Sequence, residues 1–249
     1  NSPSAPFLAE SRTSRPAKRS LRQSDPVHAQ RIGERRNSRT PRRDQVHFAQ
    51  WEIVFRVSSK QARPISLDEI MAVVARRDCG LEDIARDFIV RQVRGNPALP
   101  LSQRVASLIR ERMCGAALPI MTIVGSGNHG IFLGVPLYEL YRKHGERVLP
   151  AVLLTLLAVI HMTGKRSRIS EECGLAIKAA PALAAGMAFA FGANLAKIKR
   201  VIDSVSRALC GLKCHGARAS CGKKAERAMQ VVLRYARASS HSGAGACVS

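Results

Sequence analysis

The chain has 249 residues, of which 46% are hydrophobic, and its 40 Lys and Arg residues against 18 Asp and Glu residues give a formal net charge of +22. This hydrophobic content suffices for one substantial core and excludes a chain that is disordered throughout. The seven cysteines are an odd number in a chain that is not small, which argues against a disulfide framework and favours buried thiols or metal ligands.

Residues 1–46 form a segment that is rich in Arg and Ser and poor in apolar side chains. Such a segment buries too little apolar surface to offset its ordering entropy, so we expect a disordered basic tail. Three interpretations stay open for it: a solvated tail, a stretch that is not native to the fold, and a nucleic-acid-binding arm. Aromatic residues do not alternate with the arginines, so the tail offers no side chains on which bases could stack. If nucleic acid is a partner, we expect it to bind only through this tail.

The first predicted elements follow the tail. Residues 47–57 have the aromatic and β-branched content of a strand. Ser66 and Glu69 then have the spacing of a capping box, which predicts a helix that Cys79 and Gly80 end. Further helices are predicted, at residues 81–93, 101–113, 134–144, 149–162, 171–191, 195–209 and 222–238.

The order of these elements predicts an α+β fold that is predominantly α-helical, with a helical core and a minor β element near residues 47–57. We expect one domain at residues 47–240 and a frayed C-terminus at residues 241–249. The apolar run 148–162 is too short to span a bilayer. The longer run 174–193 is interrupted by Lys178 and Pro181. We therefore expect a soluble, cytoplasmic protein without a membrane partner.

Residues 125–130 read GSGNHG, in which Gly125, Gly127 and Gly130 have the G-x-G-x-x-G spacing of a dinucleotide-binding loop. A dinucleotide site also needs an acidic residue at the end of the next strand, whereas Glu146 precedes the next apolar run. The spacing alone is therefore weak support for a nucleotide site.

The same loop fits another anion. Glycines let backbone N–H groups approach a ligand, and a helix that begins beyond them adds a favourable dipole, so a carboxylate would suit the loop as well as a phosphate. Ser126, Asn128 and His129 add side-chain donors. A tight turn between packed elements, without a ligand, stays open as the alternative.

The cysteines give a second candidate site. Cys210, Cys214 and Cys221 lie between two predicted helices, and Cys173 begins another helix after a basic turn. Cysteines near helix starts and cations are shifted toward the thiolate, the form that binds metal. Zinc would prefer four ligands with paired short spacings, which the sequence lacks, whereas three thiolates from separated segments suit a 4Fe–4S cluster with one open iron. Buried free cysteines stay open as the alternative.

Three stretches, RMCGAALPIMTIVGSGNHGI, HMTGKRSRISEECG and CGLKCHGARASCGKKA, resemble a known family in their order and spacing. The family joins L-cysteine desulfidases, related bacterial proteins of unassigned activity and the alpha chain of iron–sulfur L-serine dehydratases, and residues 66–238 resemble its C-terminal half. The resemblance implies that Cys173, Cys214 and Cys221 hold a 4Fe–4S cluster, with Cys210 at a packing position. It also implies that residues 125–130 bind the substrate carboxylate.

The implied activity is that of a lyase, which eliminates sulfide or water from L-cysteine or L-serine and releases ammonia and a 2-oxo acid. The family loop usually reads GSGNQG, so His129 in place of glutamine leaves the substrate open. The family's catalytic cysteine and Thr-Glu-Pro motif have no counterpart in residues 1–65. His129, Lys165 and His215 are therefore the candidate bases.

That difference from the family leaves two alternatives to an active lyase. One is a non-catalytic remnant or fragment of the family, which would depend on a missing N-terminal half or on a homo-oligomer. The other is a basic nucleic-acid-binding protein.

Overall fold

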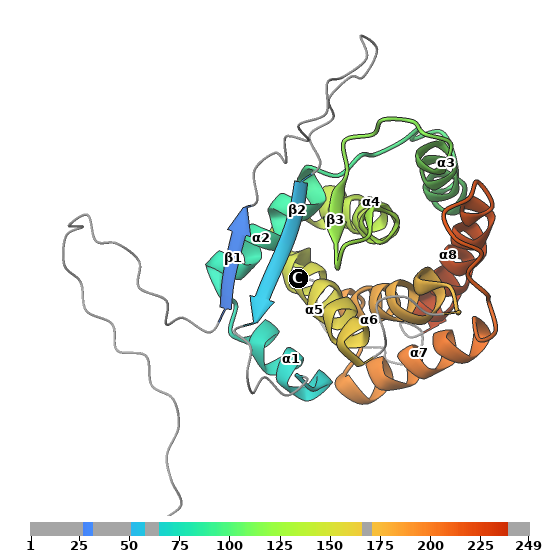
Figure 1. The fold of residues 1–249 in the computed structure, drawn as a ribbon. Helices are drawn as coiled ribbons and strands as arrows, with labels where there is room; N and C mark the ends of the chain where they lie inside the picture. The colour runs from blue at the N-terminus through green and yellow to red at the C-terminus, as the bar shows by residue number, and fades with distance from the viewer. Residues whose placement is uncertain (1–26, 32–50, 58–64, 166–170, 239–249) are drawn as a thin grey trace, which may run out of the picture.

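The computed structural model describes residues 27–31, 51–57, 65–165 and 171–238. In this part of the chain the fold is α+β and predominantly helical, as predicted, and α4 lies near the centre of the molecule with β3 beside it (Figure 1). The elements are β1 (Val27–Arg31), β2 (Trp51–Val57), α1 (Leu67–Ala75), α2 (Cys79–Val90), α3 (Leu101–Met113), β3 (Met121–Ile123), α4 (Gly127–His144), the 3-10 helix η1 (Gly145–Val148), α5 (Leu149–Lys165), the π-helix η2 (Leu175–Ala179), α6 (Ala180–Ala190), α7 (Leu195–Ala208) and α8 (Cys221–Ala238).

The small sheet has the order β1-β2-β3. β2 pairs antiparallel with β1 and parallel with β3, so that Trp51 lies opposite Met121. β2 confirms the strand predicted at 47–57. β1 lies inside residues 1–46, where we predicted a disordered tail; the rest of that segment and residues 241–249 lie outside the described residues.

Local capping explains the start of the helical region. The Ser66 hydroxyl accepts the N–H of Glu69, and the Glu69 carboxylate accepts the N–H of Ser66 at 2.7 Å, which is the predicted capping box. The prediction that Cys79 and Gly80 end this helix is wrong. α1 ends at Ala75. The Asp78 carboxylate accepts the N–H of Leu81, so Cys79 and Gly80 lie in the first turn of α2.

Helix α4 begins seven residues earlier than predicted. We expected Pro136 to open a helix at residue 134, but Pro136 lies inside α4, which starts at Gly127. The reason is a cap that the prediction had assigned to ligand binding. The Ser126 hydroxyl accepts the N–H of His129 at 3.2 Å, so the loop itself is the N-terminus of the helix.

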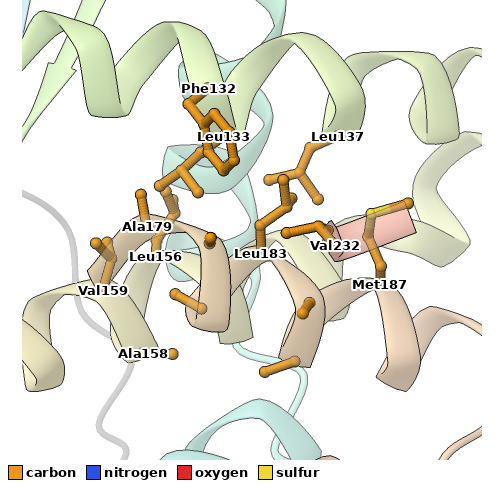
Figure 2. Close-up of a cluster of buried hydrophobic side chains, with 14 of the residues drawn as sticks. Phe132, Leu133, Leu137, Leu156, Ala158, Val159, Ala179, Leu183, Met187 and Val232 are labelled. Atoms are coloured by element: carbon orange, nitrogen blue, oxygen red, sulfur yellow. The ribbon is translucent and has the colours of Figure 1, made fainter. Parts of the chain in front are cut away.

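The core lies where α4, α5, α6 and α8 meet. Figure 2 shows Phe132, Leu133 and Leu137 of α4 facing Leu183 and Met187 of α6, and all five are buried. These side chains leave water on folding, which is the main favourable term for such a core. Figure 2 also labels core side chains of α5, η2 and α8, namely Leu156, Ala158, Val159, Ala179 and Val232.

Small residues let α5 and α6 approach closely. A Cβ at Gly186 of α6 would overlap the hydroxyl oxygen of Thr155 in α5 and would lie 2.7 Å from the carbonyl oxygen of Ala151. The Ala- and Gly-rich composition of residues 174–193 therefore serves close helix packing. The helix predicted at 171–191 is divided in the structure. Cys173 lies before the helical part, which begins with η2 and continues as α6.

One continuous helical stretch among the described residues, Gly127–Lys165, is long and apolar enough to cross a membrane. It comprises α4, η1 and α5, and 61% of its most apolar window is buried inside the fold. A buried core helix passes the same test of length and composition, so this stretch is only a weak indication of a membrane span.

Candidate functional site

A tight turn connects β3 to α4. The N–H of Ser126 donates to the carbonyl of Ile123 at 3.0 Å, and the two residues between them, Val124 and Gly125, have φ of 50° and 75°. Positive φ at both central residues is the requirement of a type I′ turn. Gly125 adopts this conformation readily, whereas Val124 is a β-branched residue in a region that such residues rarely occupy. Strained backbone of this kind is concentrated at functional sites.

Two glycines of the loop lie in tight packing, and at Gly130 the neighbouring backbone excludes a side chain. A Cβ at Gly127 would lie 2.8 Å from Nε of Arg112, and a Cβ at Gly130 would overlap the carbonyl oxygen of Met121 in β3. Gly125 is required by the turn. The G-x-G-x-x-G spacing is thus explained by the turn and by contact of α4 with its neighbours, without a nucleotide.

The N-terminus of α4 retains donors for a ligand. Ser126 satisfies the N–H groups of His129 and Gly130. Among the residues that the structure describes, the N–H groups of Gly127 and Asn128 have no acceptor. Two free N–H groups at the positive end of a helix dipole favour a bound anion.

Arg112, at the end of α3, adds a full positive charge at the same point. Its Nη1 donates to Oδ1 of Asn128 at 3.0 Å, and Nδ2 of Asn128 lies 3.5 Å from the sulfur of Met113. Burial lowers the pKa of the Arg112 guanidinium, although an arginine stays charged at neutral pH. The sequence prediction missed Arg112, because only the fold brings it to the loop.

His129 is buried, with 7% of its surface exposed. Its pKa is lowered to about 4, mainly by burial and also by the nearby charge of Lys178, and these two effects outweigh a hydrogen bond with the Gly174 backbone that raises it. The imidazole is therefore neutral at pH 7. Its Nδ1 is buried and has no hydrogen-bond partner among the described residues.

The loop and the Cys173 segment meet at His129. A Cβ at Gly174 would lie 2.9 Å from Nε2 of His129, so the glycine makes room for the imidazole. Lys178, one turn further along η2, is 2% exposed and acts electrostatically on the same imidazole. A charge within an apolar run is the sequence signal that could have identified Lys178, because a buried lysine in a core is rare.

Two of the three predicted cluster ligands come from adjacent backbone segments. Glu172 and Lys213 form an antiparallel bridge, in which the N–H of Cys173 donates to Leu212 at 2.7 Å and that of Cys214 donates to Glu171 at 2.6 Å. Side chains alternate along paired extended segments, so Cys173 and Cys214 project to the same side.

The protonation of Cys173 differs from the expectation. Burial raises the pKa of the Cys173 thiol, and this effect outweighs the backbone N–H groups of Leu175 and Ala176 and the charge of Lys224, which lower it. The expected shift toward the thiolate is therefore wrong for Cys173. The Cys221 thiol, at the start of α8, donates to the carbonyl of Gly216 at 3.5 Å.

These observations test whether the cysteines fit a cluster. The donor chemistry fits, and Cys173 and Cys214 lie on paired backbone segments, but no three Cys, His, Asp or Glu side chains of the described residues are gathered closely enough to hold a metal ion. Cys221 is turned to Gly216 and would have to rotate. The fit is therefore partial.

The remaining predicted residues are exposed. His215 lies in the loop before α8, and Lys165 lies at the end of α5, where its charge acts on His161. Neither is brought to the glycine loop by an observed contact. Cys210 is also exposed, so the packing position expected for it is wrong.

The chain is similar to known proteins over much of its length. The family model of the serine dehydratase alpha chain matches residues 43–248. A UPF0597 protein of Fervidobacterium nodosum is 29% identical over 70% of this chain and 46% of its own length. UPF0597 proteins of Clostridium botulinum (strain Langeland) and Thermosipho africanus are 30% and 35% identical, over 53% and 49% of this chain and 32% and 30% of their own lengths. The chain thus spans less than half of these curated relatives, and no solved structure matches it.

Proposed function

The chain belongs to the serine dehydratase alpha-chain family, and on that premise we propose that it acts in the elimination of water or sulfide from L-serine or L-cysteine. The products would be ammonia and a 2-oxo acid, and the protein would act in the cytoplasm. The observation that supports this proposal most is the contact of His129 with Gly174. It joins the glycine loop to the segment of Cys173, so both predicted motifs contribute to one site.

Arg112 and the start of α4 bind the substrate carboxylate in this proposal. The N–H groups of Gly127 and Asn128 have no acceptor among the described residues, and the guanidinium of Arg112 lies against Gly127. Asn128 orients the guanidinium through its 3.0 Å hydrogen bond. Charge-assisted hydrogen bonds of this kind are stronger than neutral ones and would fix the orientation of a small amino acid.

His129 is the base that we propose for the Cα proton. With Nε2 facing Gly174, Nδ1 is the ring nitrogen without a partner among the described residues, and the substrate would have to reach this buried atom for it to accept the proton. The low pKa keeps the imidazole unprotonated at pH 7, which a base requires, and it also makes the imidazole a weaker base than an exposed histidine. Loss of the Cα proton and of hydroxide or hydrosulfide leaves an enamine, whose imine form is hydrolysed to ammonia and the 2-oxo acid.

Cys173, Cys214 and Cys221 are the residues that we propose as ligands of a 4Fe–4S cluster. When bound, an iron–sulfur cluster with an open iron supplies a Lewis acid for the leaving oxygen or sulfur. Cys173 and Cys214 already project to one side of their bridge. Binding would require Cys221 to exchange its contact with Gly216 for the metal.

An anaerobic assay tests the proposal. The full chain is incubated with iron and sulfide, and the release of ammonia and pyruvate is then measured with L-serine and L-cysteine, with D-serine and L-alanine as controls. The proposal predicts release of both products from an L-substrate alone. Bound iron without release would show a non-catalytic remnant of the family and would contradict the proposal.

A further inference from the structure

Helix α8 carries a basic ridge on its outer face, defined here as Lys223, Arg227, Gln230, Arg234 and Arg237. All five side chains are exposed. They follow one another at intervals of three or four residues, so they lie in one line along the helix. At about 1.5 Å per residue the line is roughly 21 Å long.

The opposite face of α8 anchors the helix. Ala225, Ala228, Met229 and Val232 are buried, and Gly222 lies so close to α3 that a Cβ would be 2.7 Å from the carbonyl oxygen of Ala106. Figure 1 shows α8 beside α3 at the edge of the molecule. The ridge therefore lies on a helix that is packed in place against the core.

Acidic residues are scarce around the ridge. Residues 195–238 contain eleven Lys and Arg residues and two carboxylates, Asp203 and Glu226. Within the described part of the chain, Lys223, Arg227 and Arg234 form no ion pair. Arg110 of α3 lies at the N-terminal end of the ridge, because its Cβ is 3.0 Å from the Cβ position of Gly222. Among the described residues, Lys223, Arg227 and Arg234 thus carry positive charges that no carboxylate pairs with.

We propose that the α8 ridge binds the phosphate backbone of duplex nucleic acid, without reading its bases. Lysine and arginine contacts with phosphates supply most of such non-specific binding. The ridge has no exposed aromatic side chain, on which the bases of a single strand would stack. It also lacks the apolar anchors that dominate interfaces with proteins.

This surface differs from the one that the sequence indicated. The sequence placed any nucleic-acid contact in residues 1–46, whereas the ridge lies on the last described helix. The ridge shares α8 with Cys221, but none of its five residues is part of the glycine loop or a proposed cluster ligand. The two proposals can therefore fail independently.

The test uses the full chain and a 20-base-pair DNA duplex, with the dissociation constant measured by fluorescence anisotropy at several salt concentrations. In the variant Lys223→Gln/Arg227→Gln/Arg234→Gln, three phosphate contacts are removed. We expect the slope of the logarithm of the association constant against the logarithm of the salt concentration to become less steep by about 3, because each phosphate contact contributes roughly 0.9.

The matched control is Arg76→Gln/Lys143→Gln/Arg147→Gln, which removes the same charge from exposed positions elsewhere. It should leave the slope almost unchanged. Equal slopes for the ridge variant and the control would overturn the proposal, because binding would then follow net charge alone. Tighter binding of polyglutamate than of the duplex would also overturn it and would identify a surface for acidic polypeptides.

Discussion

Nε2 of His129 lies 2.9 Å from the position that a Cβ would occupy on Gly174. The two residues come from the first turn of α4 and from the segment between Cys173 and η2. Their contact favours a glycine at position 174, because a Cβ there would press on a buried imidazole, and protein interiors are closely packed.

Substitution of Gly174 by alanine should therefore destabilise the protein. The added methyl group would displace a buried ring, and overpacking of this kind costs about 1–3 kcal/mol. Gly164→Ala is the matched control, since Gly164 is also helical and nothing lies within 4 Å of its Cβ position. Urea unfolding measures both variants. An equal free energy of unfolding for the two would show that His129 does not require the glycine.

The buried imidazole should make stability depend on pH. The folded pKa of His129 is about 4, below the ordinary value of 6.5, so the unfolded chain binds an additional proton between these values. Stability should fall as the pH falls through this window, by about 1.4 kcal/mol per pH unit from this group.

The variant His129→Gln isolates that contribution. Between pH 6.5 and 5 the natural chain should lose about 2 kcal/mol more of its free energy of unfolding than the variant does. Urea unfolding at several pH values provides the measurement. The same loss in both proteins would mean that His129 is not the group that titrates.

Lys178 should contribute to the low pKa of His129. In Lys178→Met the neighbouring positive charge is removed, so the pKa of His129 should rise, yet it should stay below 6.5 because burial is the larger cause. The pKa is measured from the NMR shifts of the imidazole carbons. Lys143→Met, at an exposed position, is the control. An unchanged pKa in Lys178→Met would contradict the assigned interaction.

The three proposed cluster ligands can be tested by iron content. After anaerobic reconstitution, Cys173→Ala, Cys214→Ala and Cys221→Ala should each bind much less iron than the natural chain. Cys79→Ala, Cys114→Ala and Cys210→Ala, which change exposed thiols, should retain it. Metal analysis and the visible absorption of the cluster provide the readout. Equal iron in both sets would exclude the assigned ligands.

Local features of the fold were predictable from the sequence, since their partners are close in the chain. Ser66 and Glu69 are three residues apart, and the capping box that they form follows from this spacing. Ser126 and His129 have the same separation, but from the sequence we predict Ser126 as a ligand donor, whereas the structure shows it as the cap of α4, so the helix begins earlier than predicted.

The candidate site was predictable only in part. The glycine loop and the cysteines were recognised as motifs, and the fold brings the loop to the segment of Cys173. The groups that complete the site are joined by tertiary packing. Arg112 reaches Asn128 across 16 residues, and Lys178 reaches His129 from another helix, so neither spacing follows a local rule.

The central claim is that Arg112 and the start of α4 hold the carboxylate of an amino acid that undergoes elimination. The most direct measurement is the rate of ammonia release from L-serine and L-cysteine by the anaerobically reconstituted chain, compared between Arg112→Gln and Arg110→Gln. Both variants remove one charge from the end of α3, but Arg110 is exposed and lies toward Gly222. We predict that Arg112→Gln lowers kcat/KM by about 10-fold to 100-fold, as expected for a lost charged hydrogen bond, while Arg110→Gln changes it little. Equal rates in the two variants, or no release from either substrate by the natural chain, would contradict the account.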